Sequence, residues 1–188
     1  MALSKQTFMR KLILAVAVLF SIQLNAQKGV NKLVIAADLG IPTGDFSEIA
    51  GVGGGIMGKL LFGISPSGDI TGTTGISFYG IKDFDLGYGF DDIKGSWSII
   101  PVLAGYRHNF NGGFFLEPQI GMGIYAAKVK YQGESESNSQ SAFTWAVGFG
   151  YTKKNLEVGV RYQSGENDGS LSLVGLHFGY ILPLKNRR

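Results

Sequence analysis

The chain has 188 residues, a formal net charge of +3 and no cysteine, which excludes disulfides, thiolate metal sites and a lipid-modified N-terminal cysteine. Charged residues make up 16% of the chain, well below the roughly 25–35% found on the surface of a soluble domain. Glycine contributes 29 residues, about twice its usual share, and neither a collagen period nor a low-complexity run accounts for this excess.

The first 26 residues have the three parts of a secretory signal peptide. These are a basic region, a short apolar region and a small residue before the cleavage site: Lys5, Arg10 and Lys11; residues 12–20 (LILAVAVLF); and Ala26. The apolar run is too short to cross a bilayer as a helix, which needs about 20 residues. We expect residues 1–26 to be removed and residues 27–188 to fold as one domain. The signal contains the whole excess of basic residues, so the remainder has no net charge that would favour nucleic acid.

After the signal, apolar residues alternate with a period of two in several segments, and no segment has a helical period. The clearest example is 114–125, where Phe, Leu, Ile and Met occupy one face while Glu117, Gln119 and two glycines lie on the other. The pattern predicts eight strands, in chain order at about 32–40, 51–63, 70–81, 96–108, 114–125, 143–151, 156–163 and 174–182.

The predicted connections alternate in length. The longer ones are 41–50, 82–95, 126–142 and 164–170, and the short turns are 64–69, 109–113 and 152–155. Long loops at one end and short turns at the other are typical of membrane barrels, whose chain ends lie on the short-turn, periplasmic side. We therefore predict an all-β fold, an eight-stranded antiparallel up-and-down transmembrane β-barrel. The polar run 131–142 (YQGESESNSQSA) in the third long connection is expected to be a mobile loop.

Alternation alone does not show which face lies inside. A soluble lipocalin-like barrel would turn its apolar face inward around a ligand, and this remains the alternative. Three features favour the membrane. The polar face is rich in glycine, which suits a narrow lumen but weakens a solvent-facing strand. Trp and Tyr occur near strand ends, as in interfacial girdles. The low content of charge does not suit a water-covered surface.

Three segments in the second half of the chain have family-like patterns: 97–106 (WSIIPVLAGY), 114–123 (FFLEPQIGMG) and 156–162 (LEVGVRY). They resemble strands of the bacterial outer-membrane β-barrel family labelled "porin family protein". Gly175, Phe178 and Tyr180 resemble the signal by which the barrel-assembly machinery recognises a last strand. The resemblance covers about half of the mature chain. It implies the barrel fold and an address in the cell outer membrane, and no shared activity.

A glycine-rich run, Gly53–Lys59 (GGGIMGK), satisfies G-x-G-x-x-G and nearly satisfies G-x-x-x-x-G-K-[ST]. Those motifs bind phosphate only in a loop that opens a helix. No helical pattern follows here, and Leu60 stands where Ser or Thr would hold magnesium. We interpret the run as a glycine-rich barrel strand.

Several charged residues fall on the polar face of the predicted strands. They are Asp38, Lys59, Glu117, Glu157 and Arg161, with the orientation of Arg107 left open by the pattern. Eight strands enclose a lumen just wide enough for side chains, and isolated buried charge is costly. We interpret these charges as a structural plug. A proton or ion path and a catalytic role are the less favoured alternatives.

Glu157 and Arg161 share the polar face of one strand but lie about 13 Å apart along it, at ~3.3 Å per residue. Each is therefore expected to pair with a charge on another strand. Glu117 or Asp38 are the candidates for Arg161, and Lys59 or Arg107 for Glu157.

His108 and His177 are the two histidines of the chain, and neither has a Ser–acid set at a suitable spacing. A barrel-embedded lipid-modifying hydrolase needs a nucleophile–base pair, so we expect no enzymatic activity and keep such an enzyme as an alternative. The predicted role is a monomeric, non-enzymatic envelope component that needs no cofactor.

The second long connection, 82–94 (KDFDLGYGFDDIK), gathers four aspartates, which are weak candidates for a metal site: Asp83, Asp85, Asp91 and Asp92. The run lacks the third acid and the distal Glu of an EF-hand, so a solvated loop is preferred. Across the long connections, acids outnumber bases ten to four. We hypothesise that this acidic outer rim shares divalent cations with the lipid A phosphates of lipopolysaccharide. The expected partners are therefore membrane lipid, lipopolysaccharide and, during insertion, the barrel-assembly machinery.

Overall fold

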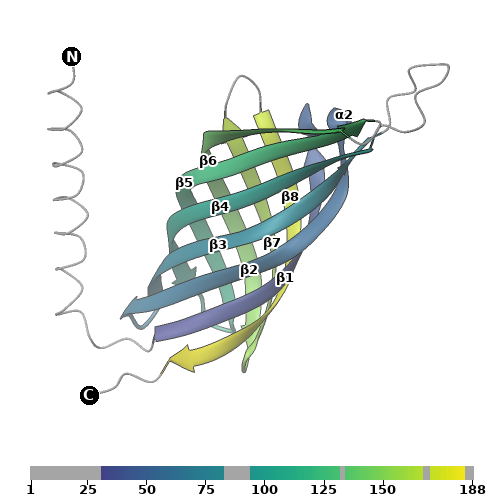
Figure 1. Cartoon of the computed structure of the whole chain (residues 1–188). Helices are drawn as coiled ribbons and strands as arrows, with labels where there is room; N and C mark the ends of the chain where they lie inside the picture. Colours follow the sequence, from purple (N-terminus) through teal and green to yellow (C-terminus); the bar gives the residue numbers. More distant parts are fainter. Residues whose placement is uncertain (1–30, 83–93, 132–133, 167–169, 185–188) are drawn as a thin grey trace, which may run out of the picture.

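The computed structural model describes residues 31–82, 94–131, 134–166 and 170–184, which form a closed antiparallel barrel of tilted strands (Figure 1). The strands are β1 (Asn31–Thr43), β2 (Ala50–Ser65), β3 (Gly68–Ile81), β4 (Lys94–Asn109), β5 (Phe114–Tyr131), β6 (Glu134–Lys153), β7 (Leu156–Glu166) and β8 (Ser170–Leu184). Each strand pairs with its sequence neighbours, and β8 closes the barrel on β1 from Asn31↔Leu184 to Thr43↔Ser172. The predicted eight-stranded up-and-down barrel is confirmed.

The third long connection differs from the prediction. Residues 126–142 were expected to form a loop, but β5 continues to Tyr131 and β6 begins at Glu134. The two strands pair without a register shift from Phe114↔Tyr151 to Tyr131↔Glu134. Continuous pairing satisfies the backbone donors and acceptors of both strands. This part of the hairpin therefore needs no apolar alternation to remain extended.

The large apolar side chains point outward. Exposed fractions of 50% to 66% are found for Ile56, Ile120, Phe143 and Phe178. Other exposed apolar residues occur along every strand. A water-soluble barrel would not expose so much contiguous apolar surface, whereas lipid covers such a band in a membrane barrel. The soluble lipocalin-like alternative is therefore wrong.

One short helix, α2 (Phe46–Ile49), lies in the first long connection, where a loop was expected. Phe46 is fully buried, and its ring packs edge-on against Tyr79 and Trp97, at centroid distances of 5.9 and 5.7 Å. A single turn has no measurable period, so the sequence pattern does not reveal it. Among the described residues, no helix is long and apolar enough to span a membrane.

The interior is layered along the barrel axis. An apolar layer lies toward the end that carries α2: Phe46, Ala50, Tyr79, Ile99, Tyr125, Ala142 and Leu173. A second, smaller apolar layer lies toward the short-turn end: Val34, Leu61 and Ile181. Buried polar and charged side chains occupy positions between these layers, as Lys59 does on β2 and Glu157 does on β7. The lumen is therefore filled by apolar and charged groups in turn.

Many interior glycines make room for rings. A Cβ atom at these positions would overlap a ring of a neighbouring side chain: Gly40 and Gly53 with Tyr79, Gly123 and Gly165 with Tyr125, Gly150 with Phe115, and Gly159 with His177. Each ring occupies space that a side chain at the glycine would fill. This packing accounts for much of the glycine on the polar face, because an eight-stranded lumen has no spare width.

Candidate functional site

The structure places the sequence-predicted charges in the barrel interior. Asp38 lies on β1, Lys59 on β2, Glu117 on β5, and Glu157 and Arg161 on β7, and each is between 2% and 6% exposed. Arg107 on β4, whose orientation the sequence left open, also points inward and is 2% exposed. The barrel closure thus brings together charges from five strands.

Two carboxylates share two cations in the main cluster. Glu117 accepts from Lys59 Nζ at 2.9 Å and from Arg107 at 2.7 and 2.9 Å. Glu157 accepts from the same Lys59 at 3.2 Å and from two nitrogens of Arg107 at 2.7 and 3.0 Å. The cluster is electrically balanced and multiply hydrogen-bonded, the condition under which buried charges are tolerated. We call these four residues the charge cluster.

Further polar and aromatic side chains surround the charge cluster. His177 Nε2 lies 3.2 Å from Glu157 Oε1. Gln119 Nε2 donates to Glu117 Oε1 at 2.9 Å and to Thr73 Oγ1 at 2.7 Å. The guanidinium carbon of Arg107 lies 3.8 Å from the centroid of the Phe115 ring, a cation–π contact. These neighbours were not predicted as site residues, although Phe115 and Gln119 alternate onto the same polar face as Glu117.

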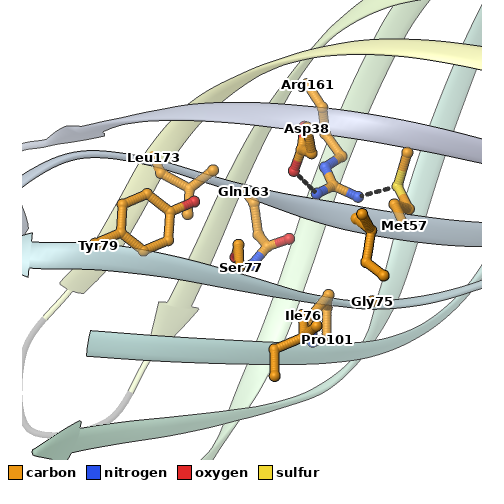
Figure 2. A pocket seen from close by; sticks show the side chains of 11 residues that line it. Asp38, Met57, Gly75, Ile76, Ser77, Tyr79, Pro101, Arg161, Gln163 and Leu173 are labelled. Carbon is orange, nitrogen blue, oxygen red and sulfur yellow. Dashed lines mark hydrogen bonds and ion pairs between the residues drawn. The ribbon is translucent and has the colours of Figure 1, made fainter. Parts of the chain in front are cut away.

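Asp38 and Arg161 form a separate pair further along the barrel. Arg161 Nη2 donates to Asp38 Oδ2 at 3.1 Å, and Nη1 lies 3.1 Å from the sulfur of Met57, as Figure 2 shows. Glu157 and Arg161 therefore have different partners. Of the candidates, Asp38 serves Arg161, and both Lys59 and Arg107 serve Glu157.

A small cavity of about 10 Å³ lies beside this pair (Figure 2). Three buried polar atoms without a partner belong to residues that line it: Asp38 Oδ1, Arg161 Nε and Gln163 Oε1. They offer two acceptors and one donor, the set that a single water satisfies. The cavity has room for a water and none for an organic substrate.

Pro101 also lines this cavity from the barrel wall. The pairs of β3 and β4 run to Thr74↔Val102 and resume at Ser77↔Ile99. Proline has no N–H to donate to the ladder, so the interruption lies where Pro101 faces β3. The cavity is therefore a packing defect at a proline in the wall.

The other sequence candidates are placed as follows. The aspartates Asp83, Asp85, Asp91 and Asp92 lie outside the described residues. His108 on β4 packs edge-on against Phe110 at 4.7 Å and lies 3.5 Å from the hydroxyl of Tyr106. Within the described segments, neither histidine bonds a Ser or Thr hydroxyl, and no group of three or more metal-ligating side chains occurs.

We predict that Arg161→Ala lowers the free energy of unfolding by about 2 kcal/mol, because it leaves the Asp38 carboxylate buried without its cation. Urea titration in detergent or heat-shift electrophoresis measures this change. The double variant Arg161→Met, Asp38→Leu should recover part of the loss. A parent-like stability of Arg161→Ala would mean that the pair is hydrated and contributes nothing.

Residues 12–180 match the family model described as "Outer membrane protein beta-barrel domain". No curated protein matches the chain. Among solved structures, the chain resembles Ail, the attachment invasion locus protein of Yersinia pestis, with a TM-score of 0.64 and 20% identity over 83% of this chain and 100% of Ail. The N-terminal barrel domain of Pseudomonas aeruginosa OprF has a TM-score of 0.53 and 13% identity, over 82% and 100% of the two chains. Neisserial surface protein A has a TM-score of 0.51 and 13% identity, over 82% and 97%.

Proposed function

Since the chain belongs to the outer membrane protein β-barrel family, we propose that it is a non-enzymatic envelope protein whose filled barrel anchors its outer loops in the membrane. The family and fold give its location, the cell outer membrane. The role within that membrane is the proposed part.

The observation that carries the proposal is the filled interior. The charge cluster joins β2, β4, β5 and β7 across the lumen with direct hydrogen bonds of 2.7–3.2 Å, and Phe46 and its apolar neighbours fill the end that carries α2. A solute would have to break these contacts and pass two apolar layers. Eight strands enclose little more than their own side chains, unlike the 16–18 strands of open porins.

We therefore expect the purified protein to give no large, stable single-channel currents in planar bilayers. The measurement is conductance in symmetric salt solution, with a larger open porin as the positive control. Steady openings of porin size would contradict the filled lumen and would favour an ion path through the charge cluster.

A lipid-modifying enzyme is the second candidate, and the histidines argue against it. Both have structural contacts in place of a nucleophile: His177 lies against Glu157 and His108 lies among aromatic rings. General-base catalysis of acyl transfer needs a hydroxyl or thiol within hydrogen-bond reach of the base. Exchange of both histidines should leave the phenotype of the protein intact, whereas loss of a defined lipid modification would favour the enzyme.

The proposed contacts of the outer loops are electrostatic. A structure of Ail contains the heparin analogue sucrose octasulfate, but the ten acids against four bases in the long connections of this chain disfavour such a polyanion. Divalent cations shared with the phosphates of lipopolysaccharide suit this charge. The barrel-assembly machinery is the proposed partner during insertion.

A further inference from the structure

The outer wall carries a groove of about 530 Å³ near the short-turn end of β6, β7, β8 and β1. Its lining is mostly apolar and aromatic and includes Tyr151, Val158, Phe178 and Tyr180. These side chains face the membrane: Phe178 is 59% and Tyr180 50% exposed in the isolated chain. The groove is therefore a hollow in the lipid-facing surface, of a size that takes part of an acyl chain.

The lining of the groove includes a cation. Lys153 lines it from the last position of β6, on the same outward face as Phe149 and Tyr151, and its side chain is exposed. Lys154 follows in the turn and is exposed as well. The described carboxylates near this end are Asp69, Glu117 and Glu157, and all three are buried and hydrogen-bonded. Glu157 also lines the groove, but its carboxylate is bound to Lys59 and Arg107. The exposed charge beside the groove is therefore positive.

The turn that follows Lys153 and contains Lys154 is held against β8. Ile181 N donates to the Asn155 carbonyl at 2.7 Å, and Asn155 Nδ2 donates to the Ile181 carbonyl at 3.1 Å. Lys154 has a φ of +56°, the one positive φ of a non-glycine residue in the described segments. Glycine and asparagine adopt this conformation most readily. Lys154 thus occupies a backbone conformation that glycine or asparagine would adopt more readily than lysine.

This end of the barrel lies toward the periplasm, because it carries the short turns, the start of β1 and the end of β8 (Figure 1). The adjoining leaflet is made of glycerophospholipid. We propose that the groove, Lys153 in its lining and the adjacent Lys154 form a site for one anionic glycerophospholipid of the periplasmic leaflet. An acyl chain lies in the groove, and Lys153 and Lys154 bind the headgroup phosphate. Lysines at such an interface place their stems along apolar surface and their ammonium groups among headgroups.

The site goes beyond the anchoring role proposed above and depends on the location of the barrel in the outer membrane. It can be tested by native mass spectrometry of the full protein released from nanodiscs of equimolar phosphatidylglycerol and phosphatidylethanolamine. We expect the parent to retain phosphatidylglycerol in preference. The double variant Lys153→Gln, Lys154→Asn should retain about tenfold less of it, and its turn should stay intact because asparagine suits the positive φ.

Two further variants separate a built site from general surface charge. Lys128→Gln removes an exposed lysine on the outward face of β5, toward the opposite end of the barrel, and should leave lipid retention unchanged. Val158→Trp fills the groove and keeps both lysines, so retention of phosphatidylglycerol should fall. Heat-shift electrophoresis checks that each barrel is folded. Equal retention of both lipids by the parent, or equal losses from the Lys128 and Lys153–Lys154 variants, would overturn the site. Bilayer conductance tests the anchoring role separately.

Discussion

Replacing Arg107 with methionine is expected to lower the free energy of unfolding by about 4 kcal/mol, more than any other single change among the interior charges. Arg107 donates to both carboxylates of the charge cluster, with nitrogen–oxygen distances of 2.7–3.0 Å. Without it, Lys59 is the one lysine or arginine of the described residues that still bonds Glu117 and Glu157, so the two buried carboxylates share a single ammonium group. Methionine keeps much of the volume of the side chain, so the loss reports charge more than packing.

The measurement is urea titration of the folded barrel in detergent or in lipid vesicles. The control is the double variant Arg107→Met, Glu157→Gln, which restores one cation to one carboxylate and should recover a large part of the loss. Lysine at position 107 should recover less, because one ammonium group cannot reproduce both the paired contact with the two oxygens of Glu157 and the two bonds to Glu117 Oε2. If Arg107→Met is as stable as the parent, water enters the cluster freely and the filled-lumen proposal fails with it.

The sequence predicts the wall of the barrel well for a simple reason. Each strand separates lipid from a crowded interior, so its side chains must alternate, as they do along β5 and β7. Whether a residue faces the lipid or the interior then follows from its place in this alternation. The same alternation puts Glu117 and Glu157 inside, but it leaves Arg107 open. The strand around it, with Gly105 and Tyr106 beside it, has too little contrast between its two faces.

Features that do not depend on alternation were missed. The predicted loop at 131–142 belongs mostly to paired strands, because hydrogen bonding to a partner strand keeps a polar segment extended. The α2 turn was missed because a single side chain, Phe46, attaches it to the barrel. The Phe46 ring enters the barrel and packs on Tyr79, and one buried residue produces no periodic pattern. The choice of Asp38 for Arg161 depends on how β7, β8 and β1 pair at barrel closure, which a single strand does not encode.

The glycine-rich run Gly53–Lys59 illustrates how a motif changes meaning once the strand is placed. It lies within β2, paired with β1 on one side and β3 on the other. No helix follows it, so its backbone N–H groups join the ladder and do not converge on a phosphate. Its glycines have separate functions set by the face on which they lie: Gly55 faces the interior, and Gly58 faces the membrane.

Gly55→Ala is therefore expected to lower the free energy of unfolding by about 3 kcal/mol, while Gly58→Ala changes it by less than about 0.5 kcal/mol. A Cβ at Gly55 would overlap the backbone carbonyl of Ile76 and lie 2.5 Å from the Ser77 Cα. Backbone atoms cannot rotate away, so β2 and β3 would have to separate. A Cβ at Gly58 meets nothing closer than the Thr74 carbonyl, at 4.0 Å. Urea titration of both variants compares them under one condition. Equal losses of stability would mean that β2 and β3 can move apart to accept a methyl group at position 55, and would contradict the prediction. A difference of the predicted size would show that Gly55 is needed for the close packing of β2 against β3.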